Sequence, residues 1–397
     1  MSLLPVEEAQ ARLLARALPL PVNSVDLLGA RGGWLAEPVA ALRDQPWAAL
    51  SAMDGYAIRH AELPGPWTLT GESRAGGVAP TDPLPHGTTI RIFTGAPLPE
   101  GADCILVQED AQAEGATIHL SGEGPSGPGR HVRPRAADFA NGSRLLDAGT
   151  FIRPAEIALA AIGGHARLPV HRAPRVALIG TGDELVPVGQ PAGPGQLPAS
   201  NSVMLAAMLA AEGAEVLDLG LIPDNLDTLA DAFRAAATAD IIVSTGGASV
   251  GDHDLVAPAI LQAGGALDFW RIAMRPGKPL MAGRLDDALL LGLPGNPVSA
   301  FVTATLFLLP LVRAMRGAPD PLPRRVTART AVALPAGGPR AEYLRATVMD
   351  GVVTHIADRD SAALLPLAHS NALVERAAHA APAAAGEDVR IIPIGNG

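Results

Sequence analysis

Residues 244–254 read STGGASVGDHD and follow the apolar run ADIIVS, which is typical of a buried strand. Adjacent glycines let backbone N–H groups approach an anion closely, and a helix that starts after such a loop adds partial positive charge. A glycine pair after a strand is equally typical of a tight turn, so this stretch alone does not decide between the two. Its candidate ligand-binding residues are Ser244, Gly246, Gly247, Ser249 and Gly251, and its candidate catalytic acid is Asp254.

Four further loops also follow predicted strands and carry complementary chemistry. They read TGDEL at 181–185, PDN at 223–225, RPGKP at 275–279 and LPGNPVS at 293–299. Because ligands of open parallel sheets bind outside the carboxyl ends of the strands, we expect all five loops to meet at one edge. The candidate substrate-binding residues in these loops are Thr181, Gly182, Arg275, Lys278, Pro279, Pro294, Asn296, Pro297 and Ser299.

Three carboxylates in the loops predict a divalent cation beside an anionic ligand. Glu184, Asp224 and Asp254 would repel a phosphate unaided, and carboxylates near bound phosphate usually hold Mg²⁺. Asp224 and Asp254 could instead be helix caps, and TGDEL could be a capped turn. Five such loops at one sheet edge favour a site for a phosphate-bearing anion and Mg²⁺ over five unrelated turns.

Lys278 is the only lysine among the 30 basic residues, and all the others are arginine. A chain that uses arginine wherever any cation suffices keeps a lysine where a compact ammonium is needed rather than a planar fork. The alternative is that Lys278 remained by chance. The first interpretation predicts that Lys278 contacts a ligand in the RPGKP loop.

The elements that must position these loops come from residues 173–317, where apolar strands alternate with helices. This pattern predicts a parallel sheet covered on both faces. Residues 45–135 contain short β-like runs between Gly/Pro turns and predict an inserted β-rich domain. Residues 1–44 and 136–172 would form a linker domain, and the β-like runs in 318–397 predict a C-terminal β-barrel. The predicted fold class is multidomain α/β and β.

Composition and charge exclude several other classes of function. The 397 residues carry a formal charge of -10, which argues against a nucleic-acid partner. The N-terminus carries acids and arginines where a signal peptide needs an apolar core. The longest apolar run, at 298–312, is shorter than the roughly 20 residues of a membrane-spanning helix. The single Cys104 is expected to be a buried apolar residue. We therefore expect a cytoplasmic protein without a membrane partner.

Together with SAMDGYA at 51–57 and FTGAPLPEGAD at 93–103, the five loops resemble the molybdopterin molybdenumtransferase (MoeA) family, to which the catalytic half of gephyrin belongs. The motifs follow the family's order along nearly the whole chain. One loop alone would be a weak signal, since TGG-type loops also occur in CinA proteins. The ordered set is highly specific.

The resemblance implies an enzyme that inserts molybdenum from molybdate into adenylylated molybdopterin and releases AMP in a Mg²⁺-dependent step. It also implies an elongated, four-part subunit whose α/β domain resembles molybdopterin adenylyltransferase. Two such subunits would form a homodimer that shares its active site, and a molybdopterin adenylyltransferase would be the upstream partner.

The family's functional positions carry over to particular residues of this sequence. Asp54, Glu184, Asp224 and Asp254 match catalytic acids, and Glu184, Asp224 and Asp254 are the implied Mg²⁺ ligands. Thr94 matches a functional position of the β-rich domain. The substrate-binding positions implied near the oxyanion and in the C-terminal domain are Lys278, Pro279, Ser299, Arg345 and Ser361.

The sequence departs from the family pattern at three places. Ala199 stands where the family commonly has aspartate, Ala136 where it commonly has glycine, and a polar or basic residue is missing from the segment after Ser361. Two alternative functions fit the sequence less well. A non-catalytic scaffold would not need the acids Asp54, Glu184, Asp224 and Asp254. A nucleotide pyrophosphatase-like hydrolase with the same α/β fold would not explain SAMDGYA or the flanking β domains.

Overall fold

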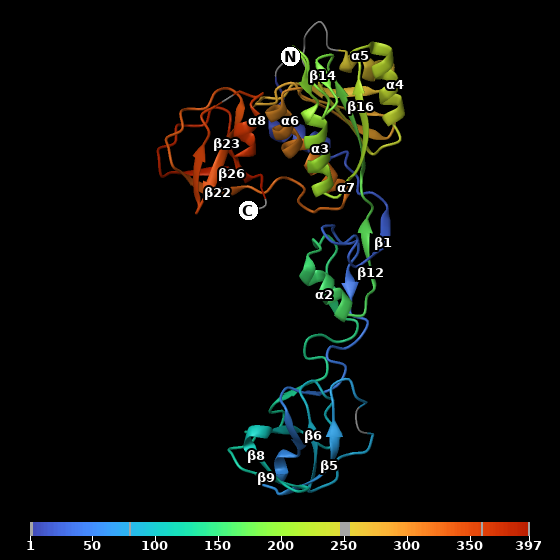
Figure 1. The fold of residues 1–397 in the computed structure, drawn as a ribbon, viewed down its shortest axis with the longest axis vertical. Coiled ribbons are helices and arrows are strands. Elements are labelled where there is room, and N and C mark those ends of the chain that lie inside the picture. Colours follow the sequence, from blue (N-terminus) through green and yellow to red (C-terminus); the bar gives the residue numbers. More distant parts are fainter. Residues whose placement is uncertain (1–2, 79–80, 247–254, 359, 396–397) are drawn as a thin grey trace. The chain divides into compact units, whose positions relative to one another are not determined.

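The computed structural model describes residues 3–78, 81–246, 255–358 and 360–395 (Figure 1). The chain forms two compact units. The first comprises Met1–Asn23, Gly32–Ala36 and Pro169–Gly397, and the second comprises Ser24–Arg31 and Glu37–Leu168. The first unit contains an α/β domain and a C-terminal barrel, and the second contains the β-rich region.

The α/β domain is built on a six-stranded sheet (Figure 1). Four strands run parallel, and β20 pairs antiparallel with both β21 and β18. Because β18 and β21 are both antiparallel to β20, β18 runs in the same direction as the four parallel strands and ends at the same edge of the sheet. In sheet order the strands are β16 (Glu215–Ile222), β13 (Arg175–Thr181), β17 (Ile241–Thr245), β21 (Ala288–Leu293), β20 (Met281–Leu285) and β18 (Ala266–Trp270).

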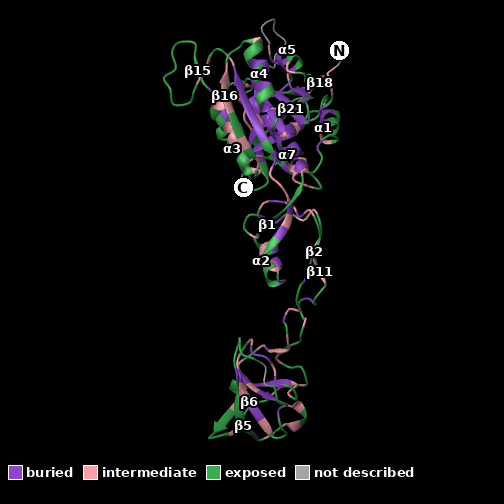
Figure 2. Ribbon diagram, turned by 90° about the vertical axis from the view of Figure 1, so that its right-hand side faces the viewer, coloured by how far each residue is buried: buried purple, intermediate pink, exposed green. Residues whose placement is uncertain are grey.

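Helices cover both faces of this sheet, as the apolar strands predicted, and Figure 2 shows its central strands buried. One face packs against α1 (Val6–Leu14), α3 (Ser200–Ala211), α6 (Pro297–Thr303) and α7 (Leu309–Met315). The other face packs against α4 (Leu226–Ala236) and α5 (Val256–Gln262). The antiparallel strand β20 was not predicted, because its sequence MAGRL is short and contains glycine and arginine.

A single helical run, Pro297–Met315, joins α6 to α7 through a π-helical segment at Ala304–Leu308. Pro310 has no N–H for the carbonyl of Leu306 four residues earlier, and the buried Gln10 of α1 donates to that carbonyl at 2.8 Å. The run is 19 residues long with mean hydropathy 1.8, which is long and apolar enough to cross a membrane. However, 83% of its most apolar window is buried inside the protein, so it is a core helix of the first unit.

Five C-terminal strands close into a barrel, as predicted, in the order β23, β24, β22, β26, β25 and back to β23. A short strand of the α/β region, β19 (Met274–Arg275), adds to the barrel in parallel with β23. The barrel elements are β22 (Val326–Thr330), β23 (Ala341–Met349), β24 (Val352–His355), β25 (Ala372–Arg376) and β26 (Asp388–Pro393), with α8 (Leu364–Ala368) between β24 and β25.

The second unit contains a six-stranded sheet with a small hydrophobic cluster on each face. Gly55 opens β4 and has no room for a side chain, because a Cβ there would lie 2.1 Å from the Leu106 carbonyl oxygen. In sheet order the strands are β7 (Cys104–Val107), β4 (Gly55–Ile58), β6 (Thr88–Ile92), β5 (Trp67–Ser73), β9 (Thr117–Leu120) and β8 (Ala111–Glu114). The unit also contains α2 (Pro154–Ile162) and the turns η1 (His60–Glu62) and η2 (Gln108–Asp110).

Outside these sheets, the described chain contains four pairs of short strands. They are β1 (Val22–Asp26) with β12 (Arg167–His171), β2 (Val39–Ala40) with β11 (Arg144–Leu146), β3 (Leu50–Ser51) with β10 (Val132–Arg133), and β14 (Leu185–Val186) with β15 (Leu197–Pro198). Isolated bridges also occur, among them Leu35 with Val170.

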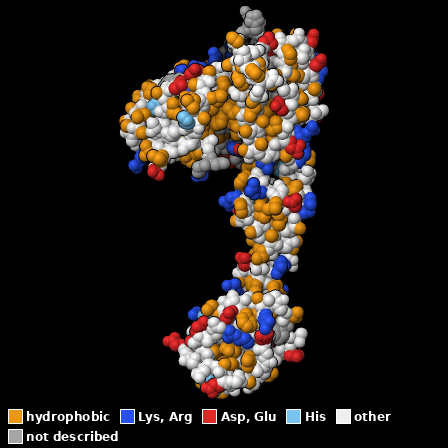
Figure 3. All heavy atoms as spheres, in the orientation of Figure 1, with side chains coloured by type: hydrophobic (Ala, Val, Ile, Leu, Met, Phe, Trp, Pro, Cys, Tyr) orange, Lys and Arg blue, Asp and Glu red, His pale blue; other side chains and the backbone are white. Residues whose placement is uncertain are grey.

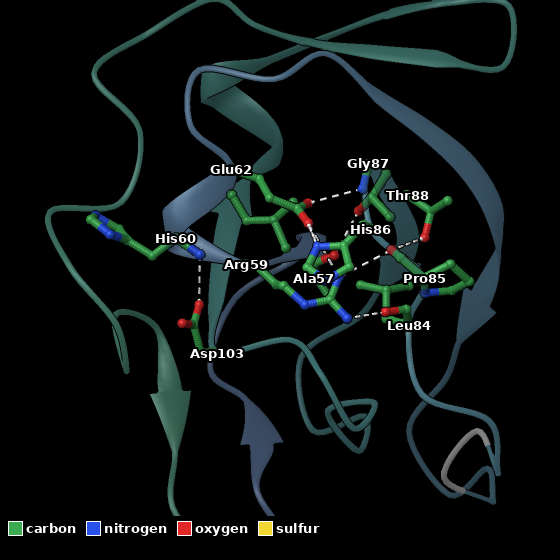
Figure 4. A network of polar contacts seen from close by, with 12 residues as sticks. Ala57, Arg59, His60, Glu62, Leu84, Pro85, His86, Gly87, Thr88 and Asp103 are labelled. Atoms are coloured by element: carbon green, nitrogen blue, oxygen red, sulfur yellow. Dashed lines mark hydrogen bonds and ion pairs between the residues drawn. The ribbon is translucent and has the colours of Figure 1, made fainter.

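A polar network fastens η1 to the loop before β6 (Figure 4). Glu62 accepts from His86 Nδ1 at 2.8 Å and from the Gly87 N–H at 3.3 Å, while Arg59 donates to the carbonyls of Leu84 and Pro85. Burial acts to raise the pKa of Glu62, but the hydrogen bonds and the Arg59 charge outweigh it and lower the pKa. The network therefore holds the loop before β6 against η1.

Two residues considered in the sequence analysis, Cys104 and Ala136, and the surface charge are described by the structure. Cys104 is buried as predicted, and burial, with Asp103 nearby, raises the pKa of its thiol to about 12. Ala136, where the family commonly has glycine, adopts the left-handed conformation with φ 58°. On the face drawn in Figure 3, basic and acidic side chains are interspersed.

Candidate active site

The loops at the carboxyl edge of the α/β sheet line one cleft of about 1280 Å³, and the barrel supplies its other wall. The loops meet because β13, β17 and β21 run parallel and β18 ends at the same edge. The predicted residues that line the cleft are Thr181, Gly182, Glu184, Asp224, Gly246, Arg275, Lys278, Pro279, Pro294, Asn296, Pro297, Ser299, Arg345 and Ser361.

Of the five other predicted residues of the α/β region, the structure describes only Ser244. Ser244 lies within β17, fully buried, and its hydroxyl has no hydrogen-bond partner among the described residues. Because it lies within the strand, its side chain points to a covered face of the sheet rather than beyond the strand's end into the cleft. Gly247, Ser249, Gly251 and Asp254 lie outside the described residues.

Asp224 is held at the cleft by the end of β13. Thr181 Oγ1 donates to Asp224 Oδ1, and the Asp224 N–H contacts Asp183 Oδ1 at 3.3 Å. Asp224 is not the cap of α4, because Asn225 accepts from the N–H groups of Asp227 and Thr228, each at 3.1 Å. The carboxylate of Asp224 is therefore available for chemistry in the cleft.

Gly246 is required by a close approach between two strand ends. Its φ is 101°, and a Cβ would lie 2.0 Å from the carbonyl oxygen of Thr181. A residue with a side chain would have to displace the backbone here. The glycine thus lets the chain at the end of β17 lie directly against the end of β13.

Asn201 was missed by sequence reasoning, although it joins two of the predicted loops. Its Nδ2 donates to Thr245 Oγ1 at 2.9 Å and to the Gly295 carbonyl at 2.6 Å. A carbonyl oxygen can only accept, so this contact fixes which end of the amide faces Gly295. The Oδ1 atom is buried without a partner in the described part of the chain. The sequence signal was the Ala-Ser-Asn segment, of which only the departure at Ala199 was considered.

The barrel reaches the cleft through the loop that carries Ser361. Asn296 Nδ2 donates to Ser361 Oγ at 2.9 Å, and the Val298 N–H donates to the Ser361 carbonyl at 3.0 Å. The side chain of Arg345 is only 4% exposed and donates to the carbonyls of Asp358 and Ala363, both at 2.6 Å. Arg345 therefore holds the Ser361 loop in place, and its predicted contact with substrate stays a prediction.

Asp54 and Thr94 belong to the second unit, where they lie together. The Thr94 N–H and Oγ1 donate to Asp54 Oδ1 at 2.7 and 2.9 Å. These bonds, the backbone one first, lower the pKa of Asp54, and Arg91 adds to the shift. Arg91 was not predicted. Its guanidinium lies 5.0 Å from the centre of the Tyr56 ring and 5.3 Å from that of Phe93, and it donates to Gln108 at 2.6 Å.

Comparison with known proteins accounts for most of the chain. Family models match residues 4–164 (MoeA N-terminal region, domains I and II), 177–314 (probable molybdopterin binding domain) and 327–394 (MoeA C-terminal region, domain IV). A molybdopterin molybdenumtransferase of Nostoc sp. is 37% identical over 387 residues, 93% of this chain and 88% of the relative. The chain belongs to the molybdopterin molybdenumtransferase family.

Other relatives agree with this membership. The molybdopterin molybdenumtransferase of Haemophilus influenzae is 37% identical over 79% of this chain and 78% of its own length. The crystal structure of a molybdopterin biosynthesis MoeA protein from Pyrococcus horikoshii matches the whole chain with a TM-score of 0.86 at 26% identity. The predicted family and fold are confirmed. The protein is an enzyme of molybdenum cofactor biosynthesis that transfers molybdenum, which excludes the scaffold and hydrolase alternatives as its main function.

Of the three predicted metal-binding carboxylates of this molybdenumtransferase, the structure describes two. Glu184 and Asp224 line the cleft, and Asp254 lies outside the described residues. Among the residues that the structure describes, no group of three or more His, Cys, Asp or Glu side chains is arranged to hold a metal ion. The donors that are present are carboxylate oxygens, the type that Mg²⁺ prefers.

Proposed function

We propose that this molybdenumtransferase takes adenylylated molybdopterin and molybdate, inserts molybdenum into the dithiolene of the pterin and releases AMP in a Mg²⁺-dependent step. The observation that carries this proposal is the cleft itself. One wall combines glycine-rich loops and cations, which suit phosphate and oxyanions, with carboxylates that suit a divalent cation. Both kinds of group are needed for a phosphate-bearing substrate that reacts with a metal oxyanion.

The residues of the cleft would divide this work by their chemistry. Gly246 and the loop at Pro294–Pro297 lie next to each other, since a Cβ on Gly295 would be 3.6 Å from the Gly246 Cα, and their backbone N–H groups would bind a phosphate. Lys278, Pro279 and Ser299 would hold molybdate, with Ser361 and Arg345 closing the site from the barrel. Asp54 and Thr94 would act from the β-rich unit.

Mg²⁺ would be held by Glu184, Asp224 and Asp254, and when bound it would neutralise charge on the phosphate that leaves with AMP. The chemistry of the donors fits, since Asp224 Oδ1 is engaged by Thr181 and Oδ2 receives no hydrogen bond from a described residue. Thr181 therefore orients Asp224 with one oxygen free to act as a ligand.

The assembly that we propose is a cytoplasmic homodimer in which Asp54 and Thr94 of one subunit complete the cleft of the other. A molybdopterin adenylyltransferase would supply the adenylylated substrate. We also propose the division into a linker domain (1–44 and 136–172), a β-rich domain (45–135), an α/β domain (173–317) and a barrel domain (318–397). Support comes from the family membership and from the placement of Asp54 in a different unit from the cleft.

The test is the Mg²⁺ dependence of AMP release from adenylylated molybdopterin in the presence of molybdate. Asp224→Asn should lower turnover about tenfold or more at limiting Mg²⁺, because one anionic ligand is lost. Asp227→Asn is the matched control, since Asp227 is an exposed acid of the same segment that does not line the cleft. Equal Mg²⁺ titrations for Asp224→Asn and the wild-type protein would refute the role of Asp224. Absence of AMP release by the wild-type protein would refute the proposed reaction.

A further inference from the structure

The wall of the cleft that carries Lys278 contains a third cation that no motif indicated. Strand β19 pairs with β23 so that Arg275 lies opposite Glu342, and the Ala341 N–H donates to the Ala273 carbonyl at 2.9 Å. This pairing places Arg340, the residue just before β23, opposite Ala273, the residue just before β19. Arg275, Lys278 and Arg340 all line the cleft, and we call them the cationic wall.

The three members of the cationic wall differ in how their charge is compensated. Arg275 has Glu342 at 4.0 Å, a long ion pair on an exposed side chain. Arg340 is half-buried, and neither a hydrogen bond nor an ion pair joins it to any described residue. The other cleft arginine, Arg345, is in contrast committed to two backbone carbonyls. Arg340 therefore presents unused N–H donors to the cleft.

Lys278 and Arg340 have no ion-pair partner among the described residues, and two such positive charges on one cleft favour the binding of an anion there. The chain as a whole carries a charge of -10, so an anionic substrate is repelled at a distance and needs local positive charge to bind. A guanidinium suits this task, because its planar fork can donate two parallel hydrogen bonds to a tetrahedral oxyanion.

We propose that Arg340 is a substrate-binding residue of the cationic wall and that it binds a tetrahedral oxyanion. This inference rests on the proposed function, in which the substrate anions are molybdate and the phosphate of adenylylated molybdopterin. Arg340 adds a bidentate donor to the cleft that Lys278 also lines. The sequence did not indicate Arg340, because it precedes a barrel strand and the β19–β23 pairing joins that strand to the α/β region.

Binding of two probes, molybdate and AMP, to the purified protein tests this role without relying on turnover. Titration calorimetry would compare the wild-type protein with Arg340→Ala, Arg340→Lys and Arg329→Ala. Arg329 is the matched control, because it is an exposed arginine of the same barrel, its side chain has no hydrogen-bond or ion-pair partner among the described residues, and it does not line the cleft. Thermal unfolding would verify that all four proteins are folded.

We expect Arg340→Ala to weaken binding of at least one probe about tenfold to a hundredfold, as for the loss of a charge-assisted hydrogen bond. Arg340→Lys should lose less, and Arg329→Ala should bind as the wild-type protein does. The probe that is affected identifies the oxyanion as molybdate or as phosphate. Unchanged affinity of Arg340→Ala for both probes, or a wild-type protein that binds neither, would overturn the inference. A wild-type protein that binds the probes but releases no AMP would contradict only the proposed reaction.

Discussion

The side chain of Lys278 comes from a loop that is tightly constrained at its base. Gly277 has φ 106°, and a Cβ there would lie 2.5 Å from Thr303 Cγ2, so the loop packs closely on α6. Lys278 itself is exposed and lines the cleft, without an ion-pair partner among the described residues. An exposed position at the cleft is not needed by a lysine whose aliphatic carbons only cover apolar surface. The structure therefore favours a role in which the Lys278 ammonium group binds a ligand.

Lys278→Arg should raise the molybdate concentration that gives half-maximal turnover, with little effect on the concentration dependence for adenylylated molybdopterin. An ammonium with rotatable donors follows a tetrahedral oxyanion, whereas a guanidinium needs room for its planar fork. The loss should be about 1.5–3 kcal/mol, or roughly tenfold to a hundredfold. The measurement is a molybdate titration of AMP release. Coincident curves for the two proteins would show that the lysine is interchangeable with arginine.

The Asp54–Thr94 pair makes a prediction about pH. Because the Thr94 bonds lower the pKa of Asp54, this carboxyl stays ionised at pH values below its ordinary 3.8. A lowered pKa in the folded state stabilises the fold above the ordinary value, and this contribution is lost as the pH falls through the lowered one. Thr94→Val should raise the pKa of Asp54 toward 3.8, as measured by carboxyl NMR titration. Thr68→Val, at an exposed threonine of β5, should leave it unchanged, and an equal pKa in all three proteins would contradict this assignment.

At the scale of elements, Asn201 connects the start of α3 to Thr245 at the end of β17 and to Gly295 in the loop after β21. Asn201→Ala should raise the KM for adenylylated molybdopterin several-fold, because the two loops lose the group that sets their separation. It should also cost about 1–3 kcal/mol of unfolding free energy. The measurements are steady-state kinetics and denaturant unfolding.

Asn371→Ala is the control for this experiment. Asn371 also makes two hydrogen bonds, with the N–H and the carbonyl of Val348 at 2.7 and 2.9 Å, but it does not line the cleft. Asn371→Ala should lower the unfolding free energy by a similar amount and leave the KM for adenylylated molybdopterin unchanged. If both variants have the wild-type KM, Asn201 has a structural role only.

The elements that sequence could predict are those with a regular apolar pattern. The strands β13 and β17 read as continuous apolar runs, and α4 has one apolar face, so their types followed from periodicity. Strand β20 did not follow, because a short run with glycine and arginine has no distinctive pattern. The cleft loops were predictable because parallel strands bring their ends together. Arg340 and Asn201 were not, because their places depend on pairings between distant segments.

At the scale of the whole molecule, the predicted site residues are divided between the two compact units. Asp54 and Thr94 lie in the second unit, and all the others in the described residues lie in the first. A site that needs both sets can be completed within one chain or between two chains. A homodimer with two shared sites is the second case, and it makes a distinct prediction for mixed subunits.

Mixing Asp54→Ala subunits with Asp224→Ala subunits should restore activity if each site takes Asp54 from one subunit and Asp224 from the other. A heterodimer then has one site with both substitutions and one with neither. After full exchange of equal amounts, half of the dimers are mixed, so about a quarter of the sites are intact. If each site were built within a single chain, every site would lack one acid and no activity would return. Turnover of the mixture, measured after subunit exchange is verified by mass spectrometry of differently tagged chains, distinguishes the two arrangements.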